Sequence, residues 1–323
     1  SEDPDDYRAV LAFVRHAEAR YYIRQGKHKA AREVIGRILR ENSAYLALDE
    51  LLFDNGVLDS TTLPANELVY MVANEPDAAV LKGYYNPGKK AAVTIRPHMR
   101  RKAEKFLLEF FEKQFDAGAE EAQEQFLEAF PVKKNRTLHA LFALAAARDN
   151  AENEIYDEAA NDAARVQQLT EPGSVFHYHA AIALAGNAEL KQGADAAIPL
   201  YTQAITGYRD TEAPENVGEV ITKIGVYYRE KADQLRAAGD DRGATKQYEA
   251  LLDLYLSAHA NRLTKQLVSR DLLDYTLNLD QIALRAATQD EDLLEDILSF
   301  YDSRIDLARR YLVTEFIFGR GFL

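Results

Sequence analysis

The segment GDDRGATKQYEAL, residues 239–251, carries the clearest structural signal in the sequence. Gly239 ends one helical stretch, a short turn follows, and the small residue Ala244 stands five positions after that glycine. Tyr248 and Leu251 follow at steps of four and three residues, which is the spacing of one face of an α-helix. Two helices approach closely only where a small side chain faces the partner, and a bulky residue one turn later fills the space beside that contact. The segment therefore predicts two antiparallel helices joined by a tight turn.

The same register recurs in three other places along the chain. They are Gly26, Ala31, Ile35 and Ile38; Tyr156, Ala159, Ala163 and Val166; and Gly193, Ala197, Tyr201 and Ala204. The turn glycine is missing from the second of these sets and displaced by one position in the third. Apolar residues recur at helical spacing almost everywhere else, and period-two alternation is nearly absent. The sequence therefore predicts an all-α fold of repeated helical hairpins.

These residues resemble the tetratricopeptide repeat. Its pattern pairs a small residue and an aromatic on the first helix with Gly, aromatic, Ala, aromatic, Ala and Pro across the turn and second helix. The first-helix positions match loosely, and they are Ala19 and Tyr22 in the first unit and Tyr228, Ala232 and Leu235 in the last. The family tryptophan is absent, because the chain has none. The resemblance covers part of the chain and implies an irregular array of antiparallel hairpins, a TPR-like α-solenoid forming a right-handed superhelix.

The chain is expected to form one helical-repeat domain over residues 7–323, after a flexible leader at residues 1–6. A repeat array buries its core unit by unit, so 323 residues require no second domain. Residues 83–97 combine an Asn-Pro-Gly turn signal with a β-branched run, which predicts a long loop or small hairpin. Residues 262–323 are expected to form capping helices and an apolar tail. The tail either folds back over the last helix pair or docks on a partner or a second copy, giving a homo-oligomer.

Composition excludes several classes of protein and site. A net charge of −13 argues against nucleic-acid binding, because the phosphate backbone demands a basic surface. No apolar run approaches the roughly 20 residues of a transmembrane segment. The chain has no cysteine, seven scattered histidines, no glycine-rich phosphate loop and no HExxH motif. We therefore expect no catalytic residues, no metal site and no cofactor, in a protein that is not an enzyme.

Tyrosine is the candidate binding residue, with 18 copies against no tryptophan. Its ring contributes apolar contact and its hydroxyl selects orientation. In a repeat array the first helix of each hairpin faces the concavity. The candidate groove residues are therefore Tyr178, Tyr227 and Tyr228, together with Tyr84 and Tyr85 in the expected loop.

A basic stretch stands at the start of the helix that follows this loop. It comprises Arg96, Arg100, Arg101, Lys102 and Lys105, and we call it the anionic-partner patch. Positive charge at a helix N-terminus opposes the macrodipole, so helix stability alone does not favour it there. Two interpretations stay open: an anionic partner, such as a phospholipid headgroup or an acidic protein surface, or pairing with carboxylates elsewhere in this chain.

Two functions remain open. The resemblance implies a non-catalytic scaffold that binds a protein or peptide partner on its concave face. The alternative is an exported component of a transport system that binds a hydrophobic small molecule or lipid in an aromatic groove. The charged, proline-containing start suggests a removed signal segment, with a lipid anchor if the protein is a bacterial lipoprotein. We therefore expect a periplasmic or outer-membrane-associated location, with the cytoplasm as the alternative. An enclosed apolar cavity would favour the small molecule, and an open groove with alternating charge would favour the peptide.

Overall fold

The computed structural model describes residues 4–42, 44–59, 63–76, 80–81, 93–209, 214, 216–260 and 265–310. Side chains are described for all of these except residues 4–6, 258–260, 265–276 and 306–310. Most of the described residues lie in helices and none lies in a strand, which confirms the all-α class. Contacts within the chain divide it into two compact units, Ser1–Thr170 and Glu171–Leu323.

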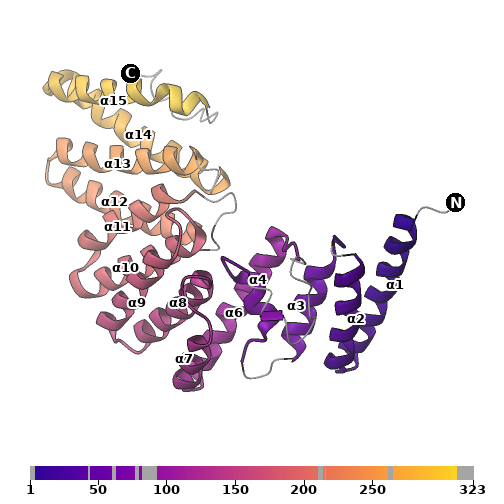
Figure 1. Ribbon diagram of the computed structural model, residues 1–323. Helices are drawn as coiled ribbons and strands as arrows, with labels where there is room; N and C mark the ends of the chain where they lie inside the picture. Colours follow the sequence, from indigo (N-terminus) through magenta and orange to yellow (C-terminus); the bar gives the residue numbers. More distant parts are fainter. Residues whose placement is uncertain are drawn as a thin grey trace. The chain divides into compact units, whose positions relative to one another are not determined.

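The first unit has eight helices among its described residues (Figure 1). They are α1 (Pro4–Arg24), α2 (His28–Glu41), α3 (Leu48–Asp59), α4 (Asn66–Val72), α6 (Pro97–Asp116), α7 (Glu120–Glu128), α8 (Arg136–Glu152) and α9 (Tyr156–Leu169). Short turns join α1 to α2 and α8 to α9, and the two helices of each pair pack closely together. Helix α6 also packs on α8.

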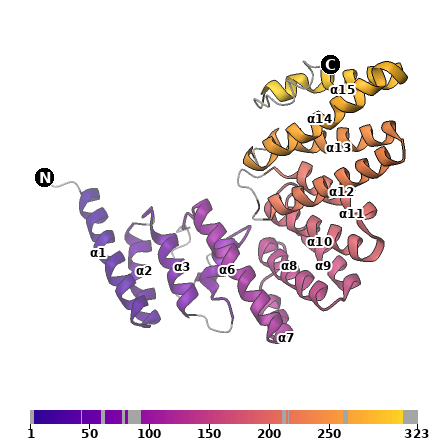
Figure 2. The ribbon, with the colours of Figure 1, turned by 180° about the vertical axis from the view of Figure 1, so that it is seen from behind.

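The second unit has six helices among its described residues, and they form three successive hairpins (Figure 2). They are α10 (Val175–Gln192), α11 (Ala194–Gly207), α12 (Val217–Ala237), α13 (Asp241–Ala260), α14 (Lys265–Gln289) and α15 (Glu291–Arg310). Each hairpin also contacts the next one, through α11 with α12 and α13 with α14. One continuous apolar core therefore runs through the unit, from Tyr178 on α10 to Tyr301 on α15.

The small residue predicted after each turn faces the interior of its unit. Ala31 on α2, Ala197 on α11 and Ala244 on α13 are each 0% exposed, and Ala159 on α9 is 1% exposed. The bulky residue one turn later is buried as well, as Tyr248 shows. The predicted register of the hairpins is therefore confirmed.

Three of the turns contain a residue with a positive φ of similar size. Gly26 and Gly239 lie in the left-handed region, with φ of 68° and 80°. Glu154, in the turn between α8 and α9, has a φ of 62° and is the one residue other than glycine with positive φ among the described residues. It stands five residues before Ala159, as Gly26 stands five before Ala31. Glu154 therefore occupies the position of the turn glycine that the sequence lacks.

Three of the sequence expectations fall partly or wholly outside the described residues. Of the leader expected at residues 1–6, residues 4–6 belong to α1. Of the loop or hairpin expected at residues 83–97, the structure describes residues 93–96 without regular secondary structure, and Pro97 begins α6. The apolar tail after Arg310 lies outside the described residues.

Candidate functional site

A row of alternating lysine and tyrosine side chains on α12 forms the candidate functional site. Lys223, Tyr227 and Lys231 follow at steps of four residues and so share one face of the helix. The end of α10 and the start of α11 supply a carboxylate for each lysine. We call the six residues the tyrosine–lysine surface: Glu189, Asp195, Tyr201, Lys223, Tyr227 and Lys231.

The first half of the surface centres on Glu189. Its carboxylate accepts a hydrogen bond of 2.9 Å from the hydroxyl of Tyr201 and pairs with the ammonium of Lys223. The Lys223 nitrogen also lies 5.1 Å from the centre of the Tyr201 ring, within the range of a cation–π contact. Burial is the main cause that raises the pKa of Tyr201, and the hydrogen bond to Glu189 adds to it. The hydroxyl therefore stays protonated and acts as a donor.

The second half repeats this chemistry around Asp195. Its carboxylate accepts hydrogen bonds from the hydroxyl of Tyr227 and, at 2.9 Å, from the ammonium of Lys231. Lys231 also donates to the Tyr227 oxygen at 2.8 Å and lies 5.1 Å from the centre of that ring. These bonds, with Tyr227 contributing most, hold the pKa of Asp195 below its ordinary value. Tyrosine, lysine and carboxylate thus meet twice along the seam between two hairpins.

The surface is open and alternates in charge. The Asp195 side chain is 79% exposed and those of Lys223 and Lys231 are 47% and 41% exposed. Exposed ion pairs contribute about 0 to 1 kcal/mol each, because water and salt screen them. A partner's charged groups can therefore replace them at small cost.

Two of the predicted groove residues lie at this seam and one does not. Tyr227 belongs to the surface, and the Tyr228 ring packs edge-on against it at 5.5 Å while also resting on the core. Tyr178 is 2% exposed, and its ring packs against that of Tyr208 at 5.5 Å. Tyr178 is thus a core residue, because its position on α10 turns it toward α11 and the segment after it. Tyr84 and Tyr85 lie outside the described residues.

Of the other five members of the surface, the sequence identifies Tyr201 only as a packing residue of its hairpin, and it does not single out Glu189, Asp195, Lys223 and Lys231. The Lys-x₃-Tyr-x₃-Lys spacing on α12 is a local signal for one shared face and could have identified Lys223 and Lys231. Glu189 and Asp195 carry no such signal, because they lie 34 and 36 residues before the lysines that they bind.

Arg96, the first residue of the anionic-partner patch, is engaged inside the first unit. Its guanidinium donates two hydrogen bonds to the carboxylate of Asp49, at 2.8 and 2.7 Å, and one to Glu50 at 2.7 Å. Asp49 is fully buried on α3, and burial would raise its pKa, but the bonds from Arg96 outweigh burial and hold that pKa below its ordinary value. For Arg96, pairing with carboxylates of this chain is the interpretation that the structure supports.

The remaining patch residues spread over more than one face of α6. Arg101 and Lys105 are four residues apart and share a face, whereas Arg100 and Lys102 point about 100° to either side of Arg101. The Lys102 ammonium lies 4.4 Å from the centre of the Phe53 ring. Arg101 and Lys105 also have interactions within the chain. The patch is therefore distributed around α6, and the binding of an anionic partner stays a prediction.

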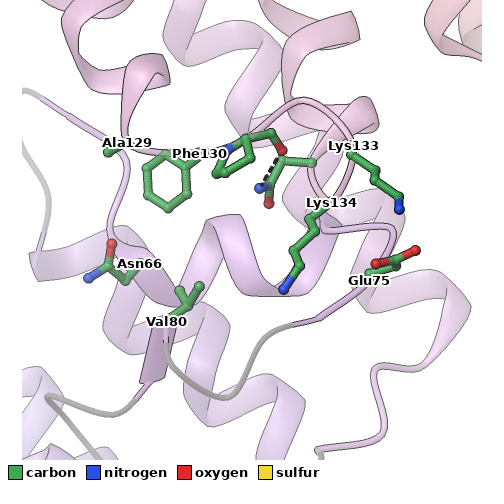
Figure 3. Close-up of a pocket in the computed structure, with 9 residues that line it drawn as sticks. Asn66, Glu75, Val80, Ala129, Phe130, Lys133 and Lys134 are labelled. Carbon is green, nitrogen blue, oxygen red and sulfur yellow. Dashed lines mark hydrogen bonds between the residues drawn. The ribbon is translucent and has the colours of Figure 1, made fainter.

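A hollow of about 560 Å³ opens in the first unit, where the segment after α7 meets the start of α4 (Figure 3). Its lining residues are Asn66, Glu75, Val80, Ala129, Phe130, Pro131, Lys133, Lys134 and Asn135. One wall is held by hydrogen bonds: the carbonyl of Lys134 accepts from the backbone N–H of Asn74 and of Glu75, and the amide of Asn135 donates to the Pro131 carbonyl at 3.1 Å. The wall combines an aromatic ring, aliphatic groups and two lysines.

Paired helices stacked through buried alanines define this chain as a helical-hairpin protein. Comparisons with protein-family models, with curated proteins and with solved structures give no match. Within the described ranges, no three or more histidine and carboxylate side chains are grouped as a metal site would need. In the same ranges, no helix has the length and apolar character needed to cross a membrane.

Proposed function

We propose that the chain is a non-catalytic scaffold that binds a protein or peptide partner on a tetratricopeptide-like solenoid with a right-handed superhelical twist. The tyrosine–lysine surface is the observation that carries this proposal. It offers an extended peptide two carboxylates, two ammonium groups and the ring of Tyr227 within two neighbouring hairpins. Its openness and alternating charge favour a peptide over an apolar ligand, because an apolar ligand needs an enclosed cavity.

To test this, the purified protein is immobilised at equal density in three forms, and the amount of each partner that binds to each form is measured. The forms are the unchanged chain, the double variant Tyr227→Ala/Lys231→Ala, and the control Arg229→Ala. Arg229 is exposed on the same helix and lies outside the surface. Partners recovered from the source cells are identified, and their affinities for the three forms are then measured by calorimetry.

We expect the double variant to weaken a true partner at least about tenfold, which corresponds to 1.4 kcal/mol, while Arg229→Ala binds as the unchanged chain does. A partner that binds all three forms equally would refute the assignment of the surface. Failure to enrich any protein over bare matrix would refute the scaffold function itself.

The hollow around Phe130 favours a second candidate function, the binding of an amphipathic small molecule with an acidic head. Its volume falls within the roughly 300–1,000 Å³ of small-molecule sites. Phe130 and Pro131 would contact the apolar part, and Lys133 would meet the acid. Titration with decanoate tests this function: we expect saturable binding that Phe130→Ser abolishes, and the absence of saturable binding would rule it out.

An exported, lipid-anchored location accompanies this second proposal. Fractionation of the source cells tests the location. Recovery with periplasmic or outer-membrane markers would support export, and recovery with cytoplasmic markers would support the alternative.

A further inference from the structure

Helix α1 carries two apolar faces. One of them packs on α2 through Ala12, Ala19 and Ile23, which are all less than 5% exposed. The other consists of large side chains that are between 57% and 68% exposed: Tyr7, Val10, Phe13, Val14 and Tyr21. Because each residue turns the helix by 100°, the centres of these two sets lie on opposite sides of α1. We call the exposed set the outer face of α1.

The outer face is unusual for the end of a helical stack. Single exposed apolar residues are common on protein surfaces, but a contiguous row of large ones marks an interaction site. The end of a stacked array needs a polar outer side to stay in solution. Both views of the ribbon place α1 at one end of the first unit, with α2 on one side of it (Figures 1 and 2). The outer face is thus positioned to bind a further helix.

The spacing of the outer face predicts the form of that further helix. Four of its residues, with the exposed Ala17 added, follow at steps of three, four, three and four residues: Tyr7, Val10, Val14, Ala17 and Tyr21. This is the a and d spacing of a heptad, which forms the narrow seam along which two helices supercoil. A partner with the same seam would match it along its whole length, and the chain itself supplies one.

The charges along α1 set the orientation of such a pair. Asp6 near the start of α1 and Arg20 near its end each directly precede a residue of the seam, Tyr7 and Tyr21, so both occupy the same heptad position beside it. In a parallel pair the like charges would lie side by side. In an antiparallel pair Asp6 of each helix lies beside Arg20 of the other. The helix is therefore complementary to a second copy of itself in the antiparallel orientation.

We propose that a second copy of the chain covers the outer face, with α1 of each copy paired antiparallel in a two-fold symmetric dimer. One pair of helices buries less surface than most stable dimers, so the dimer dissociates on dilution. The pairing goes beyond the proposed scaffold function, because the tyrosine–lysine surface lies on helices of the second unit and takes no part in it.

Sedimentation equilibrium of the purified chain over the micromolar to millimolar range tests the pairing. We expect the average mass to rise from 36.3 kDa toward twice that value as the concentration increases. Val14→Glu should raise the dissociation constant at least tenfold, because it places a charge at the centre of the seam. The control Leu46→Glu changes a side chain that is 77% exposed in the turn before α3, and it should leave the constant unchanged. Equal helical circular dichroism of both variants verifies that they fold.

A charge exchange tests the orientation. The double variant Arg20→Glu/Arg24→Glu should be monomeric, and so should Asp6→Lys, because each places like charges together in an antiparallel homodimer. An equimolar mixture of the two should dimerise. A chain that sediments as a monomer at every concentration would overturn the proposal, as would a dimer that Val14→Glu does not weaken or a mixture that stays monomeric.

Discussion

Replacing Glu154 by glycine should stabilise the first unit. With a φ of 62°, Glu154 holds a side chain in the left-handed region, which costs about 1–2 kcal/mol for a residue with a Cβ atom. Glycine adopts this conformation without that cost, but it loses about 0.4–1 kcal/mol through the greater freedom of its unfolded chain. The Glu154 side chain is exposed and has no hydrogen bond or ion pair to any described residue. The net gain should therefore be about 0.5–1 kcal/mol.

Calorimetry and urea unfolding measure this gain. For a unit of this size, 1 kcal/mol shifts the melting temperature by about 2–4 °C, so Glu154→Gly should raise the transition of the first unit by about 1–4 °C. Glu154→Ala is the matched control, because it removes the carboxylate and keeps the Cβ atom. The melting temperature of Glu154→Ala should therefore change little or not at all.

The reverse substitution at an equivalent turn completes the test. Gly26 has a φ of 68°, and a Cβ atom placed on it would meet no atom within 4 Å, so Gly26→Ala has only a backbone cost. It should destabilise the first unit by about 1 kcal/mol. If Glu154→Gly lowers the melting temperature, or Gly26→Ala leaves it unchanged, the shared turn conformation is refuted.

Three further substitutions test packing and charge in the second unit. Ala244→Leu should cost about 1–3 kcal/mol in urea unfolding, because the alanine is fully buried where α13 meets its partner helix, and an unchanged midpoint would contradict the register. Tyr178→Phe should leave stability unchanged or raise it by about 1 kcal/mol, because the buried hydroxyl has no hydrogen-bond partner among the described residues; a clear loss would reveal one. Burial, followed by the charges of Asp253 and Asp296, raises the pKa of Glu249 from 4.5 to about 7. The folded state therefore binds this proton more tightly, and the resulting stability is present below about pH 4.5 and is lost as the pH rises through 7. Glu249→Gln should reduce the loss of unfolding free energy between pH 4.5 and 8 by on the order of 1 kcal/mol, a value that allows for solvent screening. Unfolding curves collected over this pH range measure the loss, and an unchanged pH profile would refute the pKa shift.

The hairpin register could be predicted because its signals are local. A turn glycine and a small residue five positions later lie within one segment, as for Gly239 and Ala244, and both behave as the sequence indicates. The turn at Glu154 shows the limit of that signal. There a glutamate adopts the positive φ that glycine adopts at Gly26 and Gly239, and residue type alone does not predict that conformation.

Periodicity predicts a helix but not which of its faces is covered. Val10, Phe13 and Val14 have helical spacing, as expected, yet they form the exposed face of α1. Helix α1 is the first of its unit and has α2 on one side, so tertiary packing covers half of its apolar surface. The small residue Ala19 marks the face that packs on α2, but periodicity alone does not distinguish the two apolar faces.

The candidate site was predicted in part. Tyr227 and Tyr228 lie at the seam between hairpins, because α12 is the first helix of its pair. Tyr178 occupies a corresponding helix, but the rotation of α10 turns its ring into the core. Arg96 binds Asp49 across 47 residues of sequence, and a contact of that span depends on how the hairpins stack.

Successive hairpins pack side by side, with the start of α11 against α12. The chain has no cysteine, so Asp195→Cys/Lys231→Cys introduces one unique pair at side chains that lie 2.9 Å apart. A short bismaleimide should then link the pair within one folded chain and fail to do so in urea. If both cysteines react singly in the folded protein and no intramolecular link forms, the stacking of these hairpins is contradicted.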